Sequence, residues 1–219
     1  KANNDLVKYN LKNIKKSFNS PIIKICFNKY FWEITLKDKS KHQFKSLILT
    51  CPFPQLKKLA KKYLNKKILK LKVQMQPNIT VMIALKNQKN LPISSIKFND
   101  HILAWAANEN SKKRFKSNIN LWTLQATISW SKKNINKYKI DKSIMNQLIT
   151  RFIKLTGFEK NKIIFKSIHG WKYSYNYKKT PYLSLWNKKY NLGVCGDWLN
   201  GPKVENAWLS AKDLARKIK

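Results

Sequence analysis

The residues best suited to chemistry lie in one segment, Leu192–Leu214. An apolar stretch, Leu192–Cys195, predicts a short buried strand that ends at Gly196-Asp197, and apolar residues at steps of three and four predict a helix from Val204 onward. The N–H groups of a first helical turn are unpaired and carry the positive end of the helix dipole, so they suit an anionic or hydrogen-bonding ligand. The Asp197 carboxylate suits ribose-like or ribityl hydroxyls. An ordinary strand-loop-helix packing unit is the alternative for this pattern alone.

This segment resembles the C-terminal flavin-binding segment of renalase-like, FAD-dependent oxidoreductases of the amine-oxidase type. That family segment reads GDW, a short glycine loop, VEGAWLSG and then LA. The matching residues are Gly196, Asp197, Trp198, Gly201, Val204, Glu205, Ala207, Trp208, Leu209, Ser210, Leu214 and Ala215. Asn206 and Ala211 stand where the family has glycine. The resemblance implies that Asp197 binds the ribityl-diphosphate region of FAD and that the backbone of residues 204–207 faces the pyrimidine edge of the isoalloxazine.

A second match covers residues 50–55, which read Thr-Cys-Pro-Phe-Pro-Gln after a predicted strand. It is similar to the family's threonine-proline-x-proline-glutamine corner, which lies beside the dinucleotide part of FAD. Without the resemblance, these residues predict a plain strand-to-helix turn, because proline cannot continue a strand ladder. Together the two matches imply that FAD is bound by Gly196, Asp197, Trp198, Val204, Glu205, Ala207, Thr50 and Pro52.

The middle of the chain carries further matches, so the resemblance covers nearly the whole sequence. Residues 104–114 resemble the family's tryptophan-alanine-arginine-asparagine segment with its serine-lysine-proline-glycine-arginine tail, and residues 122–131 resemble its central strand. Residues 169–173 resemble its histidine-arginine-tryptophan-arginine-tyrosine strand, with Gly170 and Lys172 in place of the arginines.

Two strands of this middle part contain the candidate substrate pocket. His169, Trp171 and Tyr173 fall on one face of a strand by their period of two, where they wall a cavity over the flavin or, alternatively, form an aromatic stripe in a sheet core. Gln125 and Thr127 lie on the polar face of a predicted strand, Leu121–Trp130, and point into the same cavity or, alternatively, into solvent. No catalytic acid or base is assigned, because the cofactor supplies the reactivity.

The order of elements predicts an α+β or α/β fold. An incomplete FAD-binding domain, residues 1–66 and 188–219, is interrupted by a substrate domain, residues 67–187, with a mainly antiparallel mixed sheet and one amphipathic helix. The predicted strands are Pro21–Cys26 and Tyr30–Leu36 as a hairpin, Phe44–Thr50, 79–85, Ile102–Ala106, Leu121–Trp130, Ile163–Tyr173 and Leu192–Cys195. The predicted helices are Asp5–Asn13, 56–63, Asp141–Thr156 with Gly157 as its cap, and 204–218; residues 174–189 form a polar connection.

The composition leaves one rival class of function open. The chain has a formal net charge of +36, from 46 lysines and arginines against 10 acids, which is typical of a noncatalytic module binding RNA or other polyanions. Only Arg114, Arg151 and Arg216 are arginines, however, and the lysines are spread along the whole chain. Phosphate and base recognition favours arginine, so we interpret the charge as compositional drift with only nonspecific affinity for nucleic acid.

The cysteines and glycines indicate the cellular compartment and a missing part of the FAD-binding domain. Cys26, Cys51 and Cys195 stand far apart in apolar contexts, which indicates buried thiols in a reducing cytoplasm and no metal site. We expect a monomer without a membrane span or signal peptide. None of the five glycines forms the G-x-G-x-x-G turn that holds the FAD pyrophosphate. We therefore expect another segment of the same or a partner chain to supply that turn; a truncated, inactive flavoprotein fragment is the alternative.

The function implied by the resemblance is hydride transfer to FAD. The donor is a reduced amine or a dihydronicotinamide-type compound, and O₂ is the expected final acceptor, which yields hydrogen peroxide. The partners implied are this small-molecule substrate and the missing FAD-binding segment.

Overall fold

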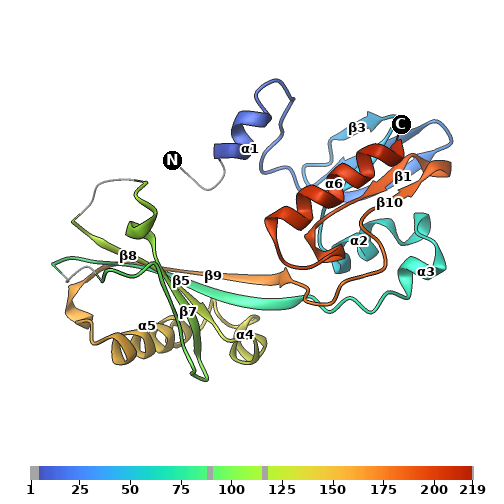
Figure 1. The fold of residues 1–219 in the computed structure, drawn as a ribbon. Helices are drawn as coiled ribbons and strands as arrows, with labels where there is room; N and C mark the ends of the chain where they lie inside the picture. Colours follow the sequence, from blue (N-terminus) through green and yellow to red (C-terminus); the bar gives the residue numbers. More distant parts are fainter. Residues whose placement is uncertain (1–4, 88–90, 115–117, 219) are drawn as a thin grey trace. The chain divides into compact units, whose positions relative to one another are not determined.

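A computed structural model describes residues 5–87, 91–114 and 118–218 (Figure 1). The chain divides into two compact units. Unit 1 consists of the residues up to Ile14 together with Gln76–Ser174, and unit 2 consists of Lys15–Met75 together with the residues from Tyr175 onward. None of the helices in the described part of the chain is long and apolar enough to cross a bilayer.

Unit 1 is built on a five-stranded antiparallel sheet in the order β6-β7-β8-β5-β9. Its strands are β5 (Gln76–Leu85), β6 (Ser95–Lys97), β7 (Leu103–Asn108), β8 (Asn120–Ala126) and β9 (Ile163–Tyr175). Its helices are α1 (Asp5–Asn10), α4 (Ile128–Asn134) and α5 (Lys142–Thr156), with short 3₁₀ turns η2 (Glu109–Lys112) and η3 (Lys160–Lys162).

One face of this sheet is covered by α5, which lies along it in Figure 1. Alternating side chains of β5 and β8 enter the core, as the period of two predicts, and the buried face of α5 packs on them. The expected helix is confirmed with its cap: Gly157 has a φ of 73° and its N–H donates to the carbonyl of Ile153. The core contains Ile79, Val81, Ile83, Leu85, Trp122, Leu124, Ala126, Ile144, Leu148 and Phe152.

The expected strand over residues 121–130 is wrong beyond Ala126. Thr127 has an extended backbone and its hydroxyl accepts a hydrogen bond from the Trp130 N–H, so it caps the N-terminus of α4. Ser131 of α4 is buried and accepts a hydrogen bond from the Ile79 N–H at 3.1 Å. Apolar residues at 128 and 130 fit both periods, and this tertiary contact favours the helix.

Unit 2 contains two three-stranded sheets, in the orders β1-β2-β3 and β10-β11-β4. The first has β1 (Ile22–Asn28), β2 (Phe31–Leu36) and β3 (Lys41–Phe44); the second has β4 (Leu47–Leu49), β10 (Leu185–Asn187) and β11 (Leu192–Val194). The helical elements are α2 (Phe53–Ala60), α3 (Lys66–Leu69) and α6 (Val204–Ile218), with 3₁₀ turns η1 (Lys61–Tyr63), η4 (Lys188–Tyr190) and η5 (Asp197–Leu199).

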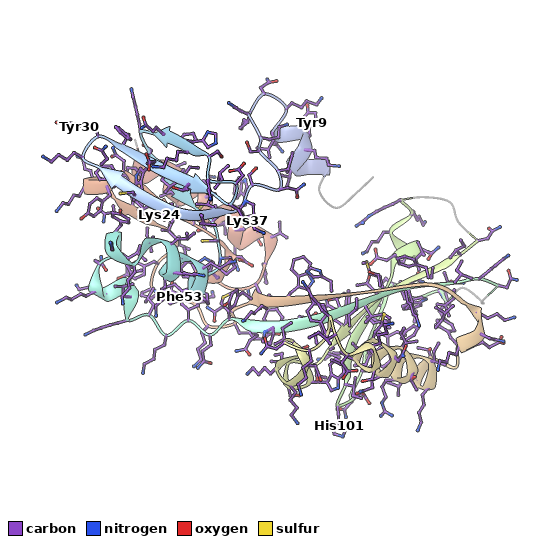
Figure 2. All side chains as sticks on the ribbon, turned by 180° about the vertical axis from the view of Figure 1, so that it is seen from behind. Tyr9, Lys24, Tyr30, Lys37, Phe53 and His101 are labelled. Atoms are coloured by element: carbon purple, nitrogen blue, oxygen red, sulfur yellow. The ribbon has the colours of Figure 1, made fainter. Side chains whose placement is uncertain are left out.

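The predicted β1–β2 hairpin is confirmed, with Lys29 in the left-handed conformation at its turn and Tyr30 beside it on the outer end in Figure 2. The single strand expected over residues 44–50 is wrong, because the chain bends between β3 and β4 and the two strands join different sheets. Cys195 is buried as expected, whereas Cys26 is exposed on β1.

The unit borders differ from the predicted domain limits at residues 66/67 and 187/188. They lie after Met75 and after Ser174, and the residues up to Ile14 group with unit 1. Two packing interactions place the borders there: Ile68 of α3 is buried in the core of unit 2, and β10, inside the expected polar connection, pairs with β11.

Candidate functional site

The candidate cofactor site lies in unit 2 at the ends of two parallel strands. β11 pairs with β4 in the register Leu192–Leu47 to Val194–Leu49, and the Cys195 N–H donates to the Leu49 carbonyl at 3.2 Å. Both strands therefore end at the same edge, which places the Thr50 corner beside the Gly196 turn. Parallel strands in α/β folds bind ligands at this carboxyl edge. The structure thus brings together the two segments that the sequence resemblance named.

A hydrogen-bonded hydroxyl fixes α6 against this turn. The Gly196 N–H donates to the Ser210 Oγ at 3.0 Å, and the Ser210 hydroxyl, which is fully buried, donates to the Leu183 carbonyl. A Cβ on Gly196 would lie 3.0 Å from the indole of Trp198, so the turn is packed too closely for a side chain. The position of Gly196 relative to α6 is therefore set by buried contacts.

Asp197 is a half-buried acid at the start of η5. Burial raises the pKa of its carboxyl above the usual range, while the neighbouring N–H of Trp198 acts in the opposite direction. Within the described ranges, no lysine or arginine forms an ion pair with it, although the chain has 46 basic residues. A partly desolvated carboxylate without a cationic partner is suited to accept hydrogen bonds from hydroxyl groups of a ligand.

The Trp198 side chain lies in the core of unit 2 and contacts the Gly196 turn from the interior. Its indole is 1% exposed and packs against Phe53 of α2, labelled in Figure 2, at 5.2 Å between ring centroids. Its carbonyl accepts a hydrogen bond from the Asn176 amide at 3.0 Å. The Trp198 Nε1 has no hydrogen-bond acceptor in the described part of the chain. Trp198 therefore supports the site from below.

The first turn of α6 is open, as an N-terminal ligand site requires. Val204 is 89% exposed, Glu205 is exposed and Ala207 is half-buried. A cavity of about 330 Å³ beside this turn is lined by Tyr177, Lys179, Asn200, Gly201, Pro202, Lys203, Glu205, Asn206 and Leu209. Residues of this first turn, two lysines and the acid Glu205 therefore border the same space.

Asn206, where the family has glycine, holds the loop that precedes α6. Its amide donates to the carbonyls of Asn200 at 3.2 Å and Gly201 at 3.1 Å, and its Oδ1 accepts from the Asn200 amide at 3.1 Å. We expect Asn206→Ala to destabilise this loop by about 1–2 kcal/mol, since three hydrogen bonds in a partly exposed site are lost. Faster amide exchange confined to residues 198–206 would support this role, and unchanged exchange there would contradict it.

Thr50 and Pro52 lie at the other side of the edge. Thr50 is exposed, and Pro52 precedes α2 without a side-chain cap. The N–H groups of Gln55 and Leu56 both donate to the Pro52 carbonyl, and Pro54 has no N–H. Only the Phe53 N–H of this first turn is left for a ligand, so α6 is the better anion-binding helix.

The predicted substrate residues lie in unit 1. The His169 and Trp171 rings of β9 pack edge to face with centroids 4.3 Å apart. Trp171 is 54% exposed, which excludes an aromatic stripe in the sheet core for this pair. Tyr173 is half-buried on the same strand face. Gln125 is half-buried on the face of β8 that points away from α5. Thr127 instead lies at the start of α4, where its hydroxyl donates to the His101 carbonyl at 2.7 Å.

A polar cluster on this open sheet face was missed from the sequence. Glu109 of η2 accepts hydrogen bonds from the Thr123 hydroxyl at 2.9 Å and from the Lys112 ammonium at 2.5 Å. Burial opposes ionisation, but these two hydrogen bonds prevail and lower the pKa of Glu109. The segment resemblance over residues 104–114 included Lys112, yet no local signal pairs Glu109 with a threonine on another strand. In the described residues, no group of three or more histidines, cysteines and acids is arranged to hold a metal.

Comparison with known proteins identifies the fold. No family model matches the chain. The fold matches a protein assigned as a protoporphyrinogen oxidase from Exiguobacterium sp. 255-15, with a TM-score of 0.74 and 12% identity over 97% of this chain and 50% of that one. It also matches a cofactor-binding variant of putrescine oxidase (TM-score 0.63, 8% identity, 91% of this chain and 48% of that one) and a fatty acid isomerase from P. acnes (0.61, 12%, 91% and 47%).

The chain therefore has a mixed α/β fold that matches part of amine-oxidase-type flavoenzymes, and it spans about half the length of those structures.

Proposed function

We propose that the chain is part of an FAD-dependent oxidoreductase of the renalase-like, amine-oxidase type. The observation that carries the proposal is the meeting of the Thr50–Pro52 corner and the Gly196-Asp197 turn at the carboxyl edge of β4 and β11. The fold match is consistent with it, since the matched structures include putrescine oxidase. FAD supplies the hydride acceptor when bound.

The residues at this edge fit such a cofactor in their chemistry. Asp197 offers ribityl hydroxyls a half-buried carboxylate that has no ion-pair partner among the described residues. The open first turn of α6 offers N–H groups to the electronegative pyrimidine edge. The absence of a side chain at Gly196 lets the turn pack closely against the Trp198 indole. Trp198 fixes this backbone from the core side.

The substrate proposed is a reduced amine or a dihydronicotinamide-type compound, with O₂ as the final acceptor. Trp171 and Tyr173 supply aromatic surface that excludes water, and His169 and Gln125 supply hydrogen-bonding groups on the same open sheet face. These residues bind and orient the substrate, and none of them is assigned a proton transfer.

We further propose that the missing pyrophosphate-binding segment joins unit 2 at the free edge of β4. The backbone N–H and C=O groups of Leu47 and Leu49 point toward β11. Because these groups alternate in direction along a strand, the N–H and C=O groups of Ile48 point to the opposite side of β4. The described residues place no strand on that side, and the Ile48 side chain is 49% exposed. An added strand would satisfy these groups. We propose a monomer for the assembled protein, with only nonspecific contact to nucleic acids.

The test is the visible absorption spectrum of the purified chain after incubation with FAD and gel filtration. We expect a protein-bound flavin spectrum, and we expect Asp197→Ala to weaken FAD binding by roughly tenfold to hundredfold, because hydrogen bonds to a charged group contribute about 1.5–3 kcal/mol. Asp38→Ala removes an exposed acid from the same unit and is expected to leave binding unchanged. A colourless wild-type chain at every FAD concentration would show that this chain alone holds no working flavin site.

A further inference from the structure

A second cavity in unit 2 lies along β11, whose first and last residues, Leu192 and Val194, both line it. It has a volume of about 700 Å³, within the range of small-molecule sites. Leu192, the first residue of β11, contributes to its floor, and η1 and α3 form one wall. β10 and the last turn of α6, at Lys217, form the other sides. None of the residues proposed to bind FAD lines this cavity.

The cavity has a mixed lining, and its apolar part is held in place. Ile68 and Leu192 are buried core residues. The Tyr63 ring packs edge-on against Trp32 at 4.7 Å and against Tyr190 at 5.2 Å, and its hydroxyl accepts a hydrogen bond from the Phe27 N–H at 3.0 Å. A ring fixed on three sides gives a preformed surface for a flat apolar group.

Two further aromatic side chains, Tyr182 and Trp186, line the space and are half-buried. The Asn187 amide donates to the Tyr63 carbonyl at 3.0 Å, which ties β10 to η1 across the cavity. The aromatic walls are thus supplied by two chain segments whose spacing is fixed by a hydrogen bond. This arrangement suits a planar ligand between them.

The charges that line the cavity are all positive. Lys217 is already neutralised, because its ammonium contacts the Ser184 carbonyl at 3.0 Å, the Ser184 hydroxyl at 3.1 Å and the Asp213 carboxylate at 2.6 Å. Lys188 and Lys189 are exposed at the rim, and neither forms an ion pair with any described acid. Among the described residues, no acid lines the cavity. The Lys189 ammonium lies over the Tyr190 ring, 5.5 Å from its centroid. An anionic group at the rim would therefore meet two ammonium groups that have no ion-pair partner among the described acids.

We infer that this cavity binds a small aromatic anion, with the ring between Tyr63 and Trp186 and the anionic group at Lys188 and Lys189. The site is independent of the proposed flavin edge, so it survives or fails separately from the proposed function.

The test is isothermal titration of the full chain with naphthalene-2-sulfonate at about 150 mM salt, which screens long-range attraction to the rest of the basic surface. We expect one saturable site. Trp186→Ala is expected to weaken binding by about tenfold, as for a central aromatic contact. Replacing Lys188 and Lys189 together by Gln is expected to weaken it by roughly threefold to tenfold.

Matched variants separate this site from general charge and exposed aromatic surface. Lys132 and Lys133 are a consecutive exposed pair on α4 in unit 1, and their double replacement by Gln should leave binding unchanged. Tyr30→Ala removes an exposed aromatic side chain of unit 2 outside both proposed sites and should also have no effect. Sulfate should not compete at equal concentration, and neutral 2-naphthol should bind more weakly.

Three outcomes would overturn the inference. Equal competition by sulfate would indicate an anion site without ring recognition, and equal binding of 2-naphthol would indicate apolar surface without charge recognition. Equal loss of affinity in the Lys132/Lys133 double variant would indicate nonspecific charge. The Lys188/Lys189 double variant changes only exposed side chains, so it remains informative if Trp186→Ala misfolds.

Discussion

Replacing Trp122 by Ala is expected to destabilise unit 1 by about 3–5 kcal/mol, the usual cost of removing a fully buried large aromatic side chain. Trp122 is 1% exposed at the centre of β8. Its ring contacts Phe152 of α5 at 5.3 Å and Phe158 at 5.8 Å between centroids, and these two rings also pack against each other at 5.6 Å. The substitution removes the ring that joins the sheet to the helix, and the rigid neighbours cannot fill the cavity.

The measurement must report on each unit separately, because a chain with two compact units need not unfold in one step. Hydrogen exchange followed by mass spectrometry serves this purpose. Peptides from β5, β8 and α5 are expected to lose protection by a factor of roughly 100 or more, whereas peptides from β11 and α6 keep theirs. Trp171→Ala is the control, since this tryptophan is 54% exposed and its loss should change stability by no more than about 0.5 kcal/mol. Equal loss of protection in both units would contradict the separation.

The Trp122 indole also has an orphaned donor, which makes a second substitution informative. Its Nε1 is buried without an acceptor in the described part of the chain. Trp122→Phe removes this unpaired donor while keeping most of the apolar volume. We therefore expect it to cost clearly less than Trp122→Ala, since the smaller cavity is partly offset by the relief of an unsatisfied polar group.

The sequence predicted the helices and strands whose buried face can be recognised from the residue pattern of that one segment. The alternation of β5 and the periodicity of α5, with Gly157 at its end, needed no knowledge of distant partners. The end of β8 and the start of α4 at Thr127 were not predicted. Over a stretch of about four residues, the apolar spacing of a strand face and of a first helical turn is the same. The split between β3 and β4 was missed for a related reason, since the sheet that each strand joins is decided by pairing with other segments.

The candidate site shows the same limit. Gly196-Asp197 and the Thr50 corner were named from a family resemblance, and nothing in their spacing indicates that β4 and β11 pair in parallel. The resemblance implies that Trp198 contacts the cofactor, whereas the structure packs its indole against Phe53 in the core. A large aromatic side chain is stabilised most when its apolar surface is buried. The second cavity was not visible at all, because Tyr63, Trp186 and Lys217 come from three distant segments.

Asp100 is the other position with a large expected effect, and the effect depends on pH. Its side chain is 1% exposed, and one carboxylate oxygen accepts hydrogen bonds from the N–H groups of Ile102 and Leu103 at 2.9 Å each. The other oxygen accepts from the Arg151 guanidinium of α5. These interactions tie the turn before β7 to α5. We expect Asp100→Ala to destabilise unit 1 by about 3 kcal/mol near neutral pH, because it leaves two N–H groups and a guanidinium without their acceptor.

The pH dependence follows from the direction of the pKa shift. Burial opposes ionisation of Asp100, but the two N–H groups and Arg151 have the larger effect. In the folded protein they hold the pKa of the Asp100 carboxyl below the ordinary aspartate value of about 3.9. The unfolded chain therefore binds the proton more readily, and the stabilisation is fully present above that value and is lost as the pH falls through the lower, folded pKa. The free energy of unfolding of unit 1 should thus differ most between the wild-type chain and Asp100→Asn above about pH 5, and the difference should shrink below about pH 4.

Asp141→Asn is the matched control for this titration. Asp141 is an exposed acid at the N-cap of α5, where it accepts a hydrogen bond from the Ser143 N–H at 2.8 Å, and asparagine serves equally well at that position. Both variants lose one negative charge from unit 1, so a general effect of net charge would change them alike. Hydrogen exchange of β7 and α5 peptides across the pH series distinguishes the cases. A constant difference between wild type and Asp100→Asn from pH 7 to pH 3 would show that the carboxylate charge contributes nothing to holding the turn against α5.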